Sequence, residues 1–376
     1  MEPKRHSIIA RSRLFQPDPA RFDQFDLGPG RPVAMADLAQ DPAWTLYCFD
    51  LATDRALFLR MPAGLDLSSA PFVYMAQVEQ AQEAATVSTA DVIAAGEHLA
   101  RPERWVHLFS TGRCGSTLAS RVFANLDGVW SASEPDAVST LVTWRDGYGG
   151  ERMRALLRAA SYWSFRPLDH SRALTCVLKY RSEAVFHASD YLHALPESSA
   201  LFLYRDLVGW SDSVFRFSQK QGVELSPGPA DDWRMVWDIL SAQAPMSDGS
   251  GVFDATADRI GVEEVLAALW VMRIEAFQEA REFGAGMRAI SYRELNEARE
   301  PAVAKLLQTL GPETDTPENR AKALAAFERD SHAGTAGSRS KAATPLDDAG
   351  VGRLHDLARS NARVRSAVSF ARSLEV

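Results

Sequence analysis

Cysteine is scarce in this sequence, and the few cysteines lie far apart. Of the 376 residues, only Cys48, Cys114 and Cys176 are cysteines. An odd number of scattered cysteines argues against a disulfide framework and against a zinc site, and it favours a reducing compartment. We therefore expect a cytoplasmic protein that holds no metal.

Long apolar runs and an excess of positive charge are missing as well. No stretch approaches the roughly 18 uninterrupted apolar residues of a membrane span, and the N-terminal segment lacks the apolar core of a signal peptide. The formal net charge of −8 argues against a general nucleic-acid binder or a binder of anionic membranes. Any anion site must therefore be a local cationic pocket in an acidic protein.

The length and composition suit one large domain with an accessory unit. The chain is 46% hydrophobic and 24% charged, which is enough apolar content for a sizeable core. We assign residues 1–100 to a small β-rich accessory region and residues 101–376 to the main domain. The elements expected in the first region are a hairpin of strands at 44–49 and 55–60, a third strand at 72–77 and a helix at 89–100. This region carries no recognisable chemistry, so we interpret it as a cap packed on the main domain.

In the main domain, short apolar runs alternate with helical patterns. The expected strands are 105–110, 129–133, 173–178, 200–204 and 287–292, and the expected helices are 182–195, 207–217, 261–283 and 300–310, with another near 233–240. This alternation predicts an α/β fold, namely a three-layer α/β/α domain with a mostly parallel sheet. Ligands of such sheets collect at the C-terminal ends of the strands.

The segment Trp105–Phe123 has the pattern of a phosphate-binding turn. A short strand is followed by the loop Gly112-Arg113-Cys114-Gly115-Ser116-Thr117 and then by a helix with Leu118 and Val122 on one face. The first N–H groups of a helix have no partner within the helix, and glycines let the backbone close on a phosphate. Arg113 adds a cation whose fork suits phosphate oxygens.

Two familiar phosphate loops do not fit this segment. The loop of nucleoside triphosphatases carries a Lys after its last Gly, where this chain has Ser116. A cysteine-based phosphatase loop would need an Arg at position 120, which is Ser120. From the loop alone, a phosphate site and a plain glycine turn before a core helix both remain open.

Charged residues follow four of the expected strands. Arg113 follows the first, Glu134 the second, Lys179 the third and Arg205 the fourth. Parallel strands would bring these side chains to one edge of the sheet. Three cations around a glycine loop indicate a site for a multiply anionic ligand, and the single carboxylate is a candidate base. The alternative is that these are ordinary charged residues at exposed strand ends.

These motifs resemble the sulfotransferases that use 3′-phosphoadenosine 5′-phosphosulfate (PAPS). TGRCGSTL at 111–118 is similar to the family's 5′-phosphosulfate loop, and RDLVGWSDS at 205–213 resembles its 3′-phosphate motif, in which a Ser follows the Arg by eight residues. SEP at 133–135 and LKYR at 178–181 resemble motifs of the tyrosylprotein and bacterial branch. The segment 291–311 and, more loosely, 331–339 also match. Cys114 replaces a usual Ser, and Leu207 and Val208 replace a usual Pro-Arg.

The resemblance implies a sulfotransferase reaction and a role for each matching residue. PAPS would donate a sulfuryl group to a hydroxyl or amine acceptor, with Glu134 as general base and with Lys179 and Arg113 stabilising charge at the breaking bond. No metal is implied, because a sulfuryl group carries less charge than a phosphoryl group. The residues expected to bind the nucleotide are Arg113, Cys114, Gly115, Ser116, Thr117, Arg205, Ser213, Tyr292 and Ser331.

Several alternatives stay open at this point. The protein could be a P-loop phosphotransferase or a catalytically inactive nucleotide-binding protein, and His170 or His332 could replace Glu134 as base. We expect His107 to belong to the core, and Arg339 to be a solvated loop residue. The aromatic residues between the second and third strands could line an acceptor cleft or pack in the core; they are Trp144, Tyr148, Tyr162, Trp163 and Phe165. The acceptor, whether glycan, peptide, lipid or small metabolite, is not specified by the sequence.

Overall fold

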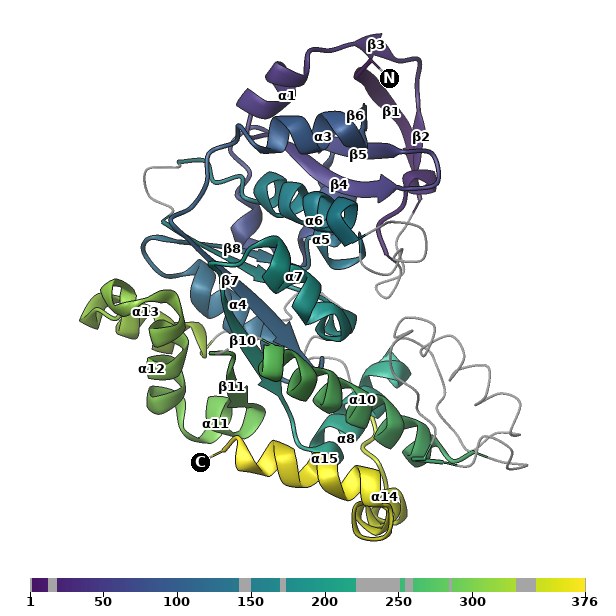
Figure 1. The fold of residues 1–376 in the computed structure, drawn as a ribbon, viewed down its shortest axis with the longest axis vertical. Coiled ribbons are helices and arrows are strands. Elements are labelled where there is room, and N and C mark those ends of the chain that lie inside the picture. The colour runs from purple at the N-terminus through teal and green to yellow at the C-terminus, as the bar shows by residue number, and fades with distance from the viewer. Residues whose placement is uncertain are drawn as a thin grey trace.

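The computed structural model has a parallel five-stranded sheet at its centre (Figure 1). It describes residues 2–12, 19–141, 150–169, 174–220, 251–253, 260–283, 286–328 and 343–375. The strand order is β11–β10–β7–β9–β8. The strands are β7 (Arg104–Ser110), β8 (Val129–Ser133), β9 (Thr175–Lys179), β10 (Ser199–Tyr204) and β11 (Arg288–Ser291). All five predicted strands and the α/β fold are confirmed.

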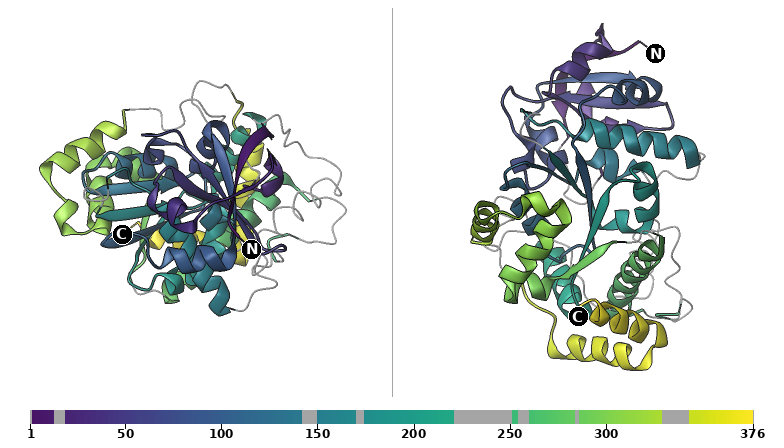
Figure 2. Two further views of the ribbon diagram at one scale, coloured as in Figure 1. Left: turned by 90° about the horizontal axis from the view of Figure 1, so that it is seen from above. Right: turned by 60° about the vertical axis from the view of Figure 1, so that its left-hand side comes forward.

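Side chains that alternate along each strand divide the main domain into two apolar cores. On β10, Leu201 and Leu203 belong to one core and Phe202 and Tyr204 to the other. The first core is covered by α4 (Ser116–Ala124), α12 (Arg299–Leu310) and α13 (Pro317–Ala326). The second is covered by α7 (Ala188–Ala194), α10 (Val262–Phe283), α14 (Asp348–Ser360) and α15 (Ala362–Ser373), and the right-hand view of Figure 2 shows the sheet between the two layers. The sheet is therefore buried on both faces, as a parallel sheet requires.

Most predicted helices of the main domain are present, with shifted ends. The helix expected at 182–195 is a 3₁₀ segment, η5 (Ser182–His187), followed by α7, and the helix expected at 207–217 is α8 (Leu207–Lys220). The last strand, β11, is shorter than predicted, because Tyr292 begins α11 (Tyr292–Glu297) instead of ending β11. Ser291 caps α11: its Oγ accepts a bond from the Glu294 N–H at 3.1 Å, and the Glu294 carboxylate accepts from the Ser291 N–H at 2.8 Å. The helix expected near 233–240 lies outside the described residues.

The N-terminal region contains an antiparallel sheet in the order β2–β1–β6–β5–β4, with β3 paired to β1. Its strands are β1 (Lys4–Arg11), β2 (Phe25–Leu27), β3 (Arg31–Pro32), β4 (Trp44–Asp50), β5 (Arg55–Arg60) and β6 (Glu83–Ser88). The predicted hairpin is β4–β5, and the predicted helix is α3 (Thr89–Gly96). The strand predicted at 72–77 is wrong. That segment forms α2 (Val73–Gln80), in which Val73, Tyr74, Gln77 and Val78 share a buried helical face.

Shorter elements connect these layers. They are α1 (Met35–Gln40), α5 (Asp136–Ser139), α6 (Gly150–Ser164), η1 (Phe22–Gln24), η2 (Leu67–Ser69) and η6 (Pro312–Thr314). The N-terminal sheet shares a continuous apolar core with the second core of the main domain. Phe58 of β5 meets Trp163 of α6 edge-to-face at 4.7 Å, and Trp163 Nε1 donates to the Val92 carbonyl of α3 at 3.0 Å. Tyr162, Trp163 and Phe165 are buried packing residues, whereas Trp144 and Tyr148 lie outside the described residues.

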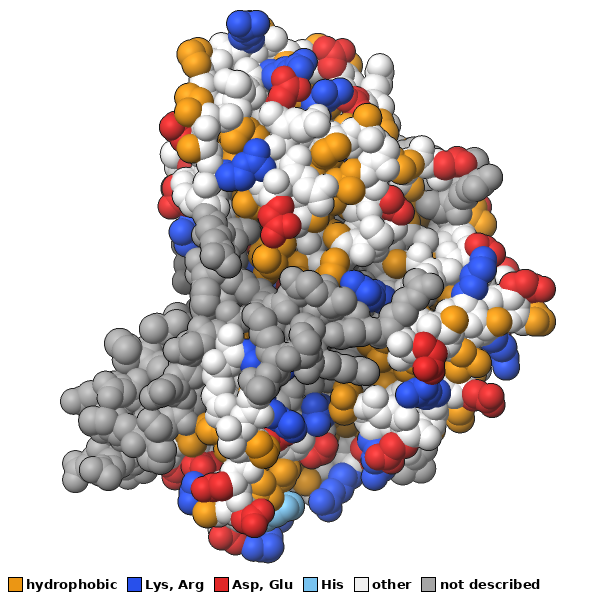
Figure 3. All heavy atoms as spheres, turned by 180° about the vertical axis from the view of Figure 1, so that it is seen from behind, with side chains coloured by type: hydrophobic (Ala, Val, Ile, Leu, Met, Phe, Trp, Pro, Cys, Tyr) orange, Lys and Arg blue, Asp and Glu red, His pale blue; other side chains and the backbone are white. Residues whose placement is uncertain are grey.

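The surface carries charge of both signs. Acidic and basic side chains are interspersed over the face shown in Figure 3. Among the described residues, no helix combines the length and apolar character needed to cross a membrane.

His107 lies inside the sheet and is a core residue, as the sequence predicts. Its ring is fully buried, and Nδ1 is 2.7 Å from the Tyr180 hydroxyl. Burial lowers the pKa of His107 to about 3. The unfolded chain takes up a proton at this histidine near pH 6.5, whereas the native state does not, so stability is lost as the pH falls below about 6.5.

We predict that His107→Gln weakens the acid sensitivity of the fold. Between pH 7 and pH 5, a buried neutral histidine should cost the native state about 2 kcal/mol. Urea unfolding at the two pH values should therefore show a smaller stability difference for His107→Gln than for the natural protein. The exposed residue His355 provides the control, since His355→Gln should leave the difference unchanged. Equal pH dependence in His107→Gln and the natural protein would contradict a neutral buried His107.

Candidate functional site

The glycine loop between β7 and α4 has an unusual backbone. Gly112, Arg113 and Gly115 all adopt left-handed conformations, with φ of 71°, 51° and 85°. Arg113 is not a glycine, so this conformation carries a steric cost of roughly 1–2 kcal/mol. Such strain tends to occur at functional sites. The N-cap residue of α4 is Gly115, which has no side chain to cap the helix. Ser116 and Thr117 occupy the first turn. The loop therefore has the backbone of an anion site.

Contacts with the neighbouring strand and helix hold this loop in place. The Thr111 N–H donates to the Leu203 carbonyl at 3.0 Å, and Trp210 Nε1 of α8 donates to the Thr111 carbonyl at 2.9 Å. Cys114 is fully buried, and its thiol donates to the same Leu203 carbonyl at 3.2 Å. Burial raises the pKa of the Cys114 thiol. The Cys114 side chain thus anchors the loop to β10.

Two arginines, Arg113 and Arg205, form an arginine cluster beside the loop. Arg113 Nε donates to Ser213 Oγ of α8 at 3.3 Å, and its guanidinium is 4.5 Å from the centre of the Phe217 ring. Arg205, which follows β10, lies 4.2 Å from the centre of the Tyr292 ring. The pKa of Arg113 is lowered first by burial and then by the positive charge of Arg205. The two guanidinium groups are therefore close enough to repel each other.

Neither of these arginines has a carboxylate partner among the described residues. The ion pairs of α8 and of the sheet edge involve other groups, such as Arg216 with Asp212. The Nε atom of Arg205 is buried and has no hydrogen-bond partner in the described part of the chain. Two neighbouring, partly buried cations with no carboxylate partner among the described residues are unfavourable unless an anion joins them. This arrangement is the strongest sign of a binding site in the structure.

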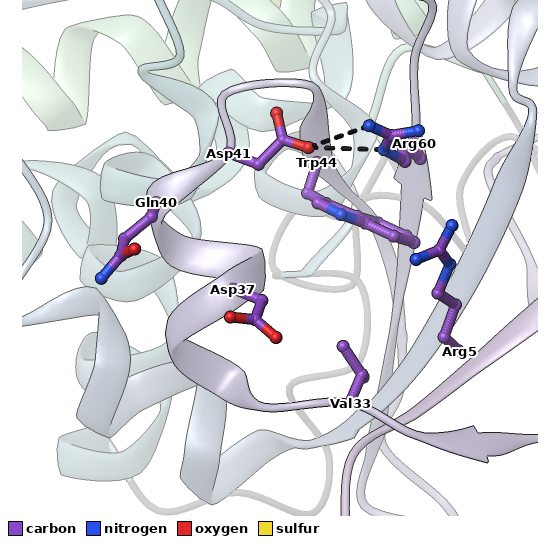
Figure 4. A pocket seen from close by; sticks show the side chains of 7 residues that line it. All are labelled: Arg5, Val33, Asp37, Gln40, Asp41, Trp44 and Arg60. Atoms are coloured by element: carbon purple, nitrogen blue, oxygen red, sulfur yellow. Dashed lines mark hydrogen bonds and ion pairs between the residues drawn. The ribbon is translucent and has the colours of Figure 1, made fainter.

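A separate pocket in the N-terminal region differs from the arginine cluster because its arginines have carboxylate partners. It has a volume of about 450 Å³ and lies between β1, β4, β5 and α1 (Figure 4). Its two arginines are already paired: Arg60 with Asp41 at 3.3 Å and Arg5 with Glu83 at 2.5 Å. Their charge is compensated within the protein, so this pocket does not match the anion site expected from the sequence.

Two glycines, Gly115 and Gly209, leave the space that Tyr292 and Arg205 occupy. A side chain at Gly115 would come within 3.2 Å of the Tyr292 ring, and one at Gly209 would come within 2.8 Å of Arg205 Nε. Tyr292 can therefore lie against the loop, and Arg205 can lie against the first turn of α8. The Trp270 indole of α10 donates to the Arg205 carbonyl at 2.8 Å, which fixes the backbone at this point.

Glu134 and Lys179 form an ion pair at the ends of β8 and β9. The Lys179 side chain is only 2% exposed and the Glu134 side chain 15%. Glu134 has a φ of 53°, although it precedes a proline, and residues before proline favour extended backbone. Its N–H donates to the Lys179 carbonyl at 2.7 Å, which holds the strained residue beside its partner.

The structure thus brings the predicted site residues together in two groups at one edge of the sheet. One group is Arg113, Arg205, Ser213 and Tyr292, and the other is Glu134 with Lys179. The positive charge of Lys179 reaches Cys114, where it opposes the rise of the thiol pKa, so the second group adjoins the loop. The Arg113 side chain is directed to α8 and not into the Glu134–Lys179 pair. Ser331, Arg339, His170 and His332 lie outside the described residues.

Sequence reasoning missed several residues at this edge. Phe217 and Gly209 on α8 and the two indoles described above support the arginine cluster, and Arg181 pairs with Asp136 beside Glu134. Asp136 and Arg181 each lie two residues beyond a predicted site residue. Neither pair spans an extended segment, because Glu134 has a left-handed φ of 53°, α5 begins at Asp136 and β9 ends at Lys179, so strand periodicity did not predict this ion pair.

No protein-family model and no curated protein matches this chain. Among solved structures, a sulfotransferase from Alicyclobacillus acidocaldarius is similar over 72% of this chain and 97% of its own, with 16% identity and a TM-score of 0.41. The sulfotransferase domain from the curacin biosynthetic pathway is similar over 72% and 98%, with 9% identity and a TM-score of 0.38. Retinol dehydratase, solved in complex with androsterone and inactive cofactor PAP, is similar over 73% and 84%, with 11% identity and a TM-score of 0.35. With these low TM-scores, the α/β fold of this chain rests on its own strand order and layers.

We predict that pyrophosphate stabilises the protein through the two arginines. A ligand of the native state adds RT ln(1 + [L]/Kd), or about 1.4 kcal/mol at ten times Kd. The rise in melting temperature with pyrophosphate should shrink by at least half in Arg113→Gln and in Arg205→Gln. Arg288→Gln, at the opposite edge of the same sheet, should keep the full rise. The same rise in all four proteins would mean that pyrophosphate does not bind at the cluster.

Proposed function

We propose that this protein is a PAPS-dependent sulfotransferase. The observation that carries the proposal is the pair of neighbouring arginines beside a glycine loop, which have no carboxylate partner in the described part of the chain. PAPS carries a phosphosulfate and a 3′-phosphate on opposite sides of its ribose, so it requires cations at two places. Arg113 follows β7 and Arg205 follows the neighbouring strand β10, and both lie at the C-terminal edge where parallel sheets bind ligands.

The residues of the edge fit this donor. The loop N–H groups with Ser116 and Thr117 suit the phosphosulfate, and Arg205 with Ser213 suits the 3′-phosphate. Arg113 donates to Ser213, so its guanidinium lies between the loop and the 3′-phosphate motif. The Arg205 guanidinium lies over the Tyr292 ring, which is beside Gly115, and we assign Tyr292 a contact with the nucleotide. We assign no role in binding to the Cys114 thiol, which is turned toward β10.

The Glu134–Lys179 pair supplies the chemistry in this proposal. Glu134 takes the proton of the acceptor hydroxyl while the acceptor oxygen forms its bond to sulfur. The bond between sulfur and the bridging oxygen breaks in line, and the negative charge grows on the phosphate that leaves as PAP. Lys179 stabilises that charge from the Glu134 side, and Arg113, whose side chain is turned to α8, adds its positive charge from the loop side. The acceptor is a hydroxyl or amine compound whose class, whether glycan, peptide, lipid or small metabolite, depends on the walls of the site.

We predict that Arg205→Ala discriminates between ligands with and without a 3′-phosphate. Removing a charge-assisted contact should weaken PAP binding by roughly 1.5–3 kcal/mol, which is about 10- to 150-fold. Binding of adenosine 5′-phosphosulfate, which lacks the 3′-phosphate, should change far less. Calorimetric titration measures both affinities, with Arg288→Ala as the control. Equal losses for the two ligands would show that Arg205 does not read the 3′-phosphate.

We predict that Glu134→Gln retains PAP affinity but loses turnover. Gln keeps the shape of Glu and cannot take a proton, so the rate should fall about 10²- to 10⁴-fold. An acidic phenol that is already ionised at the assay pH should be sulfated with a smaller loss than a neutral alcohol. Glu197→Gln, an exposed carboxylate before β10, is the matched control and should behave like the natural protein. Uniform losses for acidic and non-acidic acceptors would remove Glu134 as the base.

A further inference from the structure

The N-terminal region touches the edge of the main sheet at the Glu134–Lys179 pair. The segment between η2 and the start of α2, Pro71–Tyr74, runs beside the ends of β8 and β9, and η2 itself contacts β8 and α4. Ser133 Oγ, one residue before Glu134, donates to the Pro71 carbonyl at 2.6 Å. The Phe72 ring centre is 5.5 Å from Lys179 Nζ. Pro71 and Phe72, which belong to the region interpreted from the sequence as a cap, therefore contact the proposed reaction centre.

A second ion pair beside the first is also held by the N-terminal region. The Arg181 guanidinium donates to both carboxylate oxygens of Asp136, at 2.7 and 2.8 Å. Its Cζ is 4.3 Å from the centre of the Tyr74 ring, with Tyr74 fully buried. Asp136 is also fully buried, and its Oδ2 accepts a bond from the Ala20 N–H at 2.9 Å. Arg181 is thus enclosed between Asp136 and Tyr74.

The two pairs together form an alternating set of charges at the ends of β8 and β9. Glu134 and Asp136 stand on one strand end, and Lys179 and Arg181 stand on the other. Lys179 and Arg181 follow β9, which pairs with β8, and the charge of Arg181 interacts with that of Glu134. The bidentate bond to Asp136 and the ring of Tyr74 hold the Arg181 guanidinium in the second pair. The ion-pair partner of Glu134 is Lys179.

We propose that Tyr74 of the N-terminal region is a positioning residue for the sulfuryl-transfer site. By holding Arg181 on Asp136, Tyr74 keeps Glu134 paired with Lys179 alone and available to the acceptor. Residues 1–100 then contribute a positioning side chain to the site, in addition to covering the main domain. This inference rests on the proposed function for its consequence in turnover, while the contact itself can be tested without any turnover.

The first experiment measures the contact directly. In full-length protein labelled with ¹⁵N-arginine, the Arg181 Nε–H, assigned by its loss in Arg181→Lys, should exchange slowly with water. Tyr74→Leu removes the ring and should speed this exchange about tenfold or more. Phe58→Leu is a destabilising control in the same region, because Phe58 packs on Trp163 away from the strand ends. It should leave the Arg181 exchange unchanged. Equal acceleration in both variants, or none in Tyr74→Leu, would overturn the proposal.

The second experiment measures the consequence for the reaction. With saturating PAPS and a phenolic acceptor, release of PAP by Tyr74→Leu should fall about tenfold or more, because small displacements of reacting groups are costly. The affinity for PAP should stay within twofold. Tyr74→Phe keeps the ring and loses only the hydroxyl, which also bonds to Arg181. Its turnover should therefore fall less than that of Tyr74→Leu, and an equal loss would overturn the ring contact.

The two measurements separate this inference from the proposed function. If the natural protein neither binds PAP nor releases it from PAPS, the proposed function fails, and the Arg181 exchange still tests the contact. If the natural protein turns over PAPS and Tyr74→Leu does so at the same rate, the positioning role of Tyr74 is refuted. A turnover loss in Phe58→Leu as large as in Tyr74→Leu would refute it too, because stability alone would then explain the effect.

Discussion

The repulsion between Arg113 and Arg205 is the constraint on which the rest of the site depends. Two guanidinium groups are held close together, one of them on a strained left-handed residue, and no carboxylate among the described residues neutralises them. The fold stabilises this arrangement with elements that have nothing to do with charge: the indoles of Trp210 and Trp270 fix the backbone at the ends of β7 and β10. A bound anion would turn this electrostatic cost into binding energy.

The charged residues at the ends of β8 and β9, on the same edge of the sheet, are paired with one another. At the ends of β8 and β9 every charge has a partner, with Lys179 on Glu134 and Arg181 on Asp136. Open cations suit a ligand that brings its own negative charge, whereas a general base must keep its carboxylate available and its neighbours fixed. The N-terminal region contributes to the second group through Tyr74 and Phe72 and shares its core with the main domain. This gives residues 1–100 a physical connection to the site.

The sheet and its polar edge could be predicted because uninterrupted apolar runs such as 200–204 end directly on charged residues. The resemblance of 205–213 to a 3′-phosphate motif implied a binding role for Arg205 and Ser213, and the Ser213 Oγ accepts a bond from Arg113 Nε of the loop. The segment 72–77 forms a helix and not the predicted strand because its apolar residues also fit the face of a short helix. The predicted strand at 287–292 ends one residue early because Ser291 and Glu294 form a capping box that starts α11. The direction of the Arg113 side chain and the pairing of Arg181 with Asp136 depend on packing between distant segments. Local patterns do not encode such contacts.

The central claim is that this edge binds a nucleotide with two separated anionic groups and needs no metal to do so. Calorimetric titration of the full-length protein with PAP and with ATP, each in EDTA and in excess Mg²⁺, tests it most directly. The account predicts that PAP binds more tightly than ATP and that its affinity is the same with and without Mg²⁺. Tight binding of ATP only in the presence of Mg²⁺, together with weak binding of PAP, would contradict it.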